Sequence, residues 1–133
     1  MSVELPFAPV DTIIRRNAGE LRVSAEAAAE LAARIQERGA ALATTAAEHA
    51  TADGRKTLMV EDFAFEASSD PELELPIAPV DRIALLDIDD RYRVSKDARV
   101  ALAAELESFA DTVAAAAADS PARTRSLGSA DGS

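Results

Sequence analysis

The sequence predicts an all-α protein made of two related halves whose long helices cross antiparallel and share one core. The clearest sign is a repeat, because "ELPFAPVD" from Glu4 returns as "ELPIAPVD" from Glu74 with seven of eight letters identical. The register continues, since "RVS" occurs at 22–24 and again at 93–95. A half of roughly 65 residues would bury only about 60% of its surface by itself. Aromatic residues make up 4% of the chain, so neither half has bulky side chains for a private core.

The first half predicts a short, a long and a second short helix. The first helix starts at Pro9, because proline is tolerated in the first helical turn, and ends at Gly19, which can take the left-handed cap. Ser24 is the expected N-cap of the long helix. Apolar residues then recur at helical spacing from Leu31 to about residue 52, where "DG" ends the helix. The segment "MVEDFAFE" at 59–66 predicts the second short helix, of about two turns.

The second half repeats this order but is shorter. It has a short helix from Pro79 and a long helix from Ser95, which proline ends at Pro121. The Ser/Gly-rich tail carries no apolar periodicity, so a last short helix is missing and disorder is expected after about residue 124. The expected organisation is a first fold at 1–66, a linker at 67–73, a truncated second fold at 74–120 and a disordered tail at 121–133.

Together these stretches resemble the archaeal histone family. The matching segments are "ELPFAPVDTIIRRNAGELRVS", "GRKTLMVEDF" at 54–63, "ELPIAPVDRI" and "RYRVSKDARVALAAEL", which extend over 3–66 and 73–119. The resemblance implies tandem histone folds paired head to tail within one chain, a fused form of the usual dimer. It also implies double-stranded DNA as the partner, bound across the paired loops and the ends of the first helices.

The resemblance also suggests which residues contact DNA, and implies that Arg55 pairs with Asp62 and so holds its loop. Arg82 matches the arginine that the family inserts into the minor groove, whereas the first half has Thr12 at that place. Head-to-tail pairing would place the loop at 55–57 beside Arg93. The expected DNA-contacting residues are Arg15, Arg16, Arg22, Arg55, Lys56, Thr57, Arg82 and Arg93.

The charge of the chain opposes this interpretation, because nucleic-acid-binding domains are normally basic. The formal net charge is −10, and the acidic residues are spread along the chain. That pattern suggests a halophilic source; the alternative is an ordinary acidic protein. With about six phosphate contacts, raising salt from roughly 0.2 M to 2 M would cost about five decades of affinity. The sequence therefore predicts weak or sequence-biased DNA binding, in a chromatin or transcription-regulatory role. The alternative is a histone-fold module for protein interaction, or for heterodimerisation with other histone-fold proteins, with little DNA wrapping.

Other functions find little support in the sequence. No cysteine is present, which excludes disulfides and thiolate zinc sites. The acidic "DIDD" at 87–90 lacks the glycine and distal glutamate of a calcium loop, and His49 has no second ligand nearby. No nucleophile has an evident base, so we expect no enzyme, cofactor or metal. We expect a soluble cytoplasmic, chromosome-associated protein without membrane contact, which self-associates through the first histone fold.

Overall fold

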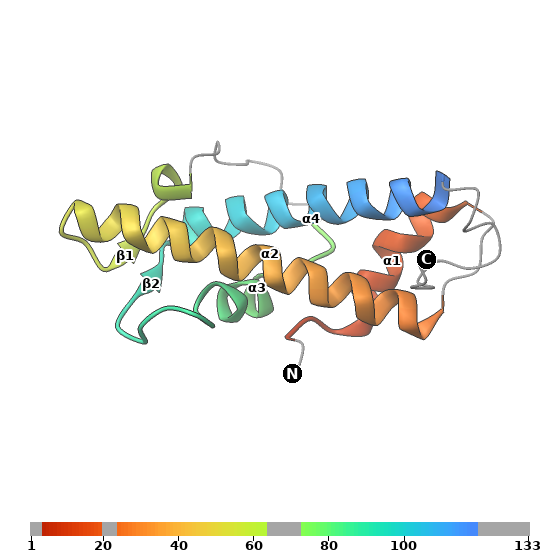
Figure 1. Ribbon diagram of the computed structural model, residues 1–133, viewed down its shortest axis with the longest axis horizontal. Helices are drawn as coiled ribbons and strands as arrows, with labels where there is room; N and C mark the ends of the chain where they lie inside the picture. The colour runs from red at the N-terminus through yellow and green to blue at the C-terminus, as the bar shows by residue number, and fades with distance from the viewer. Residues whose placement is uncertain (1–3, 20–23, 64–72, 120–133) are drawn as a thin grey trace.

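Two long helices, α2 (Ala25–Ala52) and α4 (Lys96–Asp119), run antiparallel along the molecule and form its framework (Figure 1). Short helices α1 (Phe7–Ala18) and α3 (Ile77–Ala84) pack against them. The remaining elements are the strands β1 (Thr57–Leu58) and β2 (Arg93–Val94) and the 3₁₀ helix η1 (Val60–Phe63). This computed structural model describes residues 4–19, 24–63 and 73–119. The described elements are helical, as predicted, apart from the two-residue strands β1 and β2.

One buried cluster joins all four α-helices. α1 packs against α4 as well as α2, and α3 packs against α2 as well as α4. Fully buried side chains come from each of them: Ile13, Ile35, Ile83, Leu102 and Leu106. The apolar stripes of the two long helices are therefore covered by each other and by both short helices, which agrees with the expectation of one shared core.

Side chains of α3 and α4 lie close to the backbone of α2 at Gly39, in the middle of that helix. A Cβ atom added there would lie 2.7 Å from Ile83 Cγ2 and 3.0 Å from Leu106 Cδ1. Glycine costs a helix interior about 1 kcal/mol relative to alanine. The close approach of α3 and α4 explains why glycine is nevertheless found at this position.

The N-termini of both long helices are capped by serine, as predicted. Ser24 Oγ accepts a hydrogen bond from the Ala27 backbone N–H at 2.9 Å, and Ser95 Oγ accepts one from Ala98 at 3.1 Å. Each bond satisfies a backbone donor that has no partner inside the helix. The long helices are thus started by local chemistry that repeats in the two halves.

The predicted starts of the short helices were wrong by two residues. The helices begin at Phe7 and Ile77, so Pro9 and Pro79 occupy the third helical position. The reason is that the first four N–H groups of any helix lack an intrahelical acceptor, so a proline there loses no hydrogen bond. Gly19 caps α1 with φ of 64°, as expected, but its ψ of −118° lies outside the left-handed helical region.

The second short helix of the first half also differs from its prediction. Within the described residues it is the single 3₁₀ turn η1 at Val60–Phe63, where an α-helix over 59–66 was expected. Residues 64–66 lie outside the described residues, as do nearly all of the predicted linker and the predicted disordered tail. In the second half α4 ends at Asp119, close to the predicted stop at Pro121.

Candidate nucleic-acid interface

The loop after α2 and the loop before α4 meet at one end of the molecule (Figure 1). Strands β1 and β2 pair in parallel there, with Thr57 opposite Arg93. The Arg93 backbone N–H donates to the Lys56 carbonyl at 2.9 Å, and the Ser95 N–H donates to the Leu58 carbonyl at 2.9 Å. Residues 55–57 therefore lie beside Arg93, the juxtaposition expected from sequence. The two-residue strands themselves were not predicted, because they are too short to show a periodicity.

Arg55 is held inside this loop by a bidentate contact with Asp62. Its Nη1 lies 2.8 Å from Asp62 Oδ2, and its Nη2 lies 3.0 Å from Asp62 Oδ1. The same carboxylate, whose side chain is only 3% exposed, accepts from the Met59 N–H at 2.7 Å. These bonds, above all the one from Arg55, lower the pKa of Asp62 despite its burial. The guanidinium of Arg55 thus fastens the loop to η1.

His49 adds a second tie between η1 and α2. Its Nδ1 lies 2.9 Å from the backbone carbonyl oxygen of Asp62, which can only accept, so the ring nitrogen donates. Both ties fix the geometry of the loop that carries residues 55–57.

Three cations at this end have no carboxylate partner among the described residues. Lys56 Nζ lies 4.8 Å from the centre of the Tyr92 ring, an arrangement that orients the ammonium without neutralising it. Arg93 and Lys96 are exposed, and within residues 4–19, 24–63 and 73–119 neither forms an ion pair. Sequence reasoning missed Lys96, although it directly follows the "RVS" motif that pointed to Arg93. These side chains can reach an anionic ligand without first breaking a salt bridge.

Three other predicted contact residues are paired or outside the described chain. Arg15 forms an ion pair with Asp11 at 2.7 Å, and Arg82 forms one with Glu4 at 2.9 Å. Arg22 lies outside the described residues. DNA contact by these arginines stays a prediction, and for Arg15 and Arg82 it would compete with an existing ion pair.

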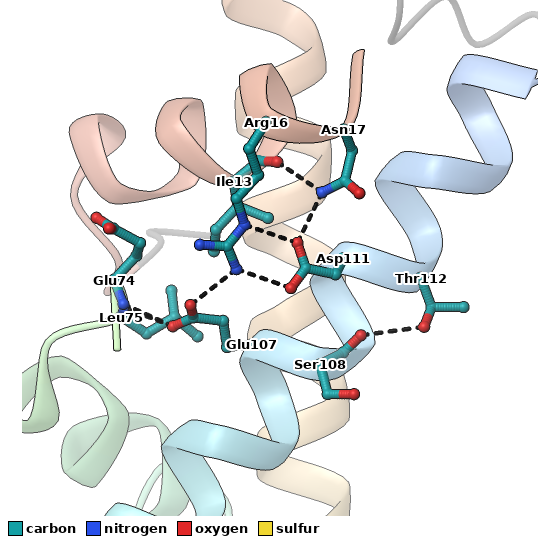
Figure 2. A network of polar contacts seen from close by, with 9 residues as sticks. All are labelled: Ile13, Arg16, Asn17, Glu74, Leu75, Glu107, Ser108, Asp111 and Thr112. Carbon is teal, nitrogen blue, oxygen red and sulfur yellow. Dashed lines mark hydrogen bonds and ion pairs between the residues drawn. The ribbon is translucent and has the colours of Figure 1, made fainter. Parts of the chain in front are cut away.

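Arg16 is the centre of a polar cluster between α1 and α4. Figure 2 shows its side chain directed toward α4, where Nε and Nη2 donate to Asp111 at 2.9 and 2.7 Å, and Nη2 also donates to Glu107 at 2.8 Å. Asn17 donates to Asp111 at 2.7 Å. These contacts raise the pKa of Arg16, mainly through the hydrogen bonds to Asp111, and lower the pKa of Asp111. A phosphate contact by Arg16 stays a prediction, and it would compete with two carboxylates.

The acidic "DIDD" segment shows no arrangement suited to a metal. Asp89 accepts from the Arg91 N–H at 2.8 Å and pairs with its guanidinium at 3.1 Å. These contacts, led by the side-chain hydrogen bond, lower the pKa of Asp89 to about 2. Over the described ranges, no three acidic or histidine side chains are grouped so that they could hold a metal ion.

Comparison with known proteins identifies the family to which this architecture corresponds. The family profile described as "Histone-like transcription factor (CBF/NF-Y) and archaeal histone" matches the chain twice, over residues 3–65 and 73–126. The chain belongs to this family. Its class of function is therefore that of DNA-binding chromatin proteins.

Two histones show how far the likeness extends. One subunit of the archaeal histone HAN1 from Thermococcus zilligii is 46% identical over 59 residues, which cover 44% of this chain and 87% of that protein. The crystal structure of the histone from Methanopyrus kandleri superposes with a TM-score of 0.61 at 26% identity, covering 92% of this chain and 87% of that one. No helix in the described part of this histone-family chain has both the length and the apolar character to cross a membrane.

Proposed function

We propose that the chain is a fused histone doublet, with a first fold at 1–66, a linker at 67–73, a truncated second fold at 74–120 and a tail at 121–133. Support comes from the two family matches within one chain and from the antiparallel contact between α2 and α4. The likeness to the Methanopyrus kandleri histone, which extends over most of both chains, agrees with it. In this proposal the two folds pair head to tail and act as each other's core.

The doublet binds duplex DNA mainly through the end that carries β1 and β2. The observation that supports this most directly is the group Lys56, Arg93 and Lys96, whose charges are not neutralised by carboxylates in the described structure. Phosphate contacts release counterions from DNA, and each contributes to the salt dependence of binding. Thr57 follows Lys56 and pairs with Arg93 in the β-ladder, and we expect its hydroxyl to add a neutral hydrogen bond to phosphate.

The same cations predict a modest affinity. For each phosphate contact, the logarithm of the DNA affinity falls by about 0.9 for every tenfold rise in salt concentration. Counted from about 1 M salt, one contact therefore raises the affinity about fourfold at roughly 0.2 M salt and contributes almost nothing at 2 M. The net charge of −10 adds repulsion at low salt, and the carboxylate partners of Arg15, Arg16, Arg55 and Arg82 reduce the number of free cations. We therefore propose a regulatory role on the chromosome, in transcription, instead of bulk packaging.

A binding titration with a matched control tests this proposal. Lys56→Gln together with Arg93→Gln lowers affinity for duplex DNA about tenfold at roughly 0.2 M KCl and leaves it nearly unchanged at 2 M. The control is Arg34→Gln with Arg38→Gln, which changes the net charge equally but in the middle of α2. Equal losses in both variants would show a general charge effect and remove the proposed site.

The second candidate function is a protein-interaction module with little DNA wrapping. It is favoured by a specific observation, namely that four predicted DNA-contacting arginines are held by carboxylates. In that case, neither the unaltered chain nor the control variant binds DNA at any salt concentration in the titration. A measurable affinity of the unaltered chain decides for the first function.

We further propose that chains associate through the first fold only, because that half alone carries the loop and η1 after its long helix within the described residues. Association then stops at two chains. Light scattering on DNA-bound protein should show pairs of chains, and longer oligomers would contradict the proposal. The dispersed acidic surface agrees with a halophilic source, which a stability that rises up to molar KCl would support.

A further inference from the structure

The cluster of Arg16, Asn17, Glu107 and Asp111 joins α1 of the first half to α4 of the second half (Figure 2). The internal repeat allows its counterpart to be located, since the short helices correspond at an offset of 70 and the long helices at 71. The counterparts carry different chemistry: Leu86 for Arg16, Asp87 for Asn17, Gln36 for Glu107 and Ala40 for Asp111. α1 continues to Ala18, whereas α3 ends at Ala84, so Leu86 and Asp87 follow their helix and do not lie on it. The cluster is therefore asymmetric both in its side chains and in the backbone that carries them.

The buried position on the long helix has one role that both halves share. Gln36 Oε1 accepts from the Glu4 N–H at 2.8 Å, and Glu107 Oε1 accepts from the Glu74 N–H at 2.7 Å. In the first half an amide oxygen accepts this bond, whereas Glu107 Oε1 also accepts from the Leu75 N–H at 3.1 Å. The second oxygen of Glu107 faces Arg16 at 2.8 Å, a contact that the charge of the carboxylate strengthens.

Pairing between two identical halves would leave these groups without partners. If two first halves paired, Arg16 would meet Gln36 and Ala40, which offer no carboxylate. If two second halves paired, the 8%-exposed Glu107 side chain would face no cation. Removing one partner from a buried ion pair is strongly destabilising, because the other charge stays desolvated.

We propose that this cluster selects the pairing partner of the first half. The first half pairs with a long helix that carries carboxylates at the positions of Glu107 and Asp111. The second half of this chain, or of another copy, offers such a helix. The first half does not pair with histone folds that have an amide and a small apolar residue at those positions, and the first half of another copy is one of these. The proposal rests on the head-to-tail pairing of the two folds, and it disfavours heterodimerisation with unrelated histones.

Moving the charge to the first half tests this selection. Gln36→Glu is nearly isosteric and places a carboxylate where two paired first halves would each offer it an Arg16. In this chain the position that corresponds to Arg16 carries Leu86, which follows the end of α3, is exposed and offers no cation. We expect Gln36→Glu to lower the melting temperature at low concentration and to strengthen dimerisation about tenfold, measured by light scattering over a concentration series. Adding Leu86→Arg supplies a cation at that corresponding position, and we expect it to weaken the dimer and to raise the melting temperature again.

The outcomes separate this inference from the proposed function. If Gln36→Glu lowers stability equally with and without Leu86→Arg and leaves the mass unchanged, the cluster does not select a partner. Should Gln36→Glu fail to fold, Arg16→Leu with Glu107→Gln removes the ion pair between the two halves and leaves only Asp111 charged, and an unchanged dimerisation constant would overturn the inference. The chain has no cysteine, so Asn17→Cys with Asp111→Cys reports internal pairing by an intrachain disulfide. Failure of that disulfide, with only interchain products, would refute the internal pairing itself.

Discussion

The pair of Arg55 and Asp62 offers a stability prediction in which the two partners should behave differently. Asp62 is almost fully buried, with a side chain 3% exposed, whereas Arg55 is 29% exposed. Removing Arg55 leaves a buried carboxylate that still accepts from the Met59 N–H at 2.7 Å but has lost its cation. Removing the charge of Asp62 leaves Arg55 in contact with solvent and still paired with Asp53 at 2.9 Å. Loss of the arginine should therefore be the more damaging change.

The expected size follows from what each substitution leaves behind. Breaking a buried pair by removing one partner costs about 3–5 kcal/mol, and the partial exposure of Arg55 places Arg55→Met at about 3 kcal/mol. Asp62→Asn keeps one acceptor oxygen for the Met59 N–H and Arg55 Nη1, but its NH₂ group replaces the oxygen that accepts from Arg55 Nη2. The loss of that hydrogen bond and of the charge assistance is about 2 kcal/mol. Both values refer to the free energy of unfolding near neutral pH.

The pH dependence gives this prediction its sharpest test. Because Arg55 lowers the pKa of Asp62 in the folded protein, the pair contributes fully above the unfolded pKa of about 4. Its contribution is lost as pH falls through the folded value. In Arg55→Met the buried carboxylate has no cation, so protonation relieves the defect. The difference in unfolding free energy between the unaltered protein and Arg55→Met should therefore shrink from pH 7 toward pH 3.

Urea unfolding followed by circular dichroism, at a fixed salt concentration and several pH values, measures these differences. The control is Arg34→Met, which breaks an exposed pair with Glu30 on α2 and should cost less than about 1 kcal/mol. A cost for Arg55→Met no larger than that of the control would refute the reasoning. So would a difference that stays constant from neutral to acid pH.

Three further predictions concern packing, the inter-half cluster and helix capping. Gly39→Ala should destabilise the fold by about 1 kcal/mol in urea unfolding, because overpacking against α3 and α4 outweighs the gain in helix propensity. The comparison is Ala41→Gly on the exposed face of α2, which should cost about as much through the loss of helix propensity alone. Arg16→Leu should lower the melting temperature, and adding Glu107→Gln should recover most of the loss in a thermal scan. Ser24→Ala should cost about 1 kcal/mol by the loss of its cap, and Ser24→Gly only a few tenths.

Much of the fold could be predicted because its signals are local or repeated. The serine caps act on a backbone N–H three residues away, so Ser24 and Ser95 mark the starts of the long helices in any fold. The helix starts at Phe7 and Ile77 were misplaced because proline is compatible with several positions of the first turn. The loop pairing of Thr57 with Arg93 was expected from the family resemblance, whereas the strands themselves were too short to detect.

The candidate site was less predictable because its state depends on contacts between distant residues. Arg16 was a good candidate by its place at the end of a helix, but it meets Glu107 and Asp111, which lie 91 and 95 residues away in the sequence. Arg82 likewise meets Glu4, 78 residues earlier. No local pattern distinguishes these arginines from Arg93, whose side chain is free of ion pairs in the described structure.

The sequence by itself determined that the chain has two related halves, that each contains a capped long helix, and that these stretches resemble archaeal histones. It could do so because caps, apolar spacing and repeats are properties of neighbouring residues. Only the tertiary structure decided which cations remain unpaired, since ion pairing depends on side chains that α1, α3 and α4 bring together from distant parts of the chain. The same packing made Gly39 necessary and left Lys56, Arg93 and Lys96 as the free charges at one end of the described structure.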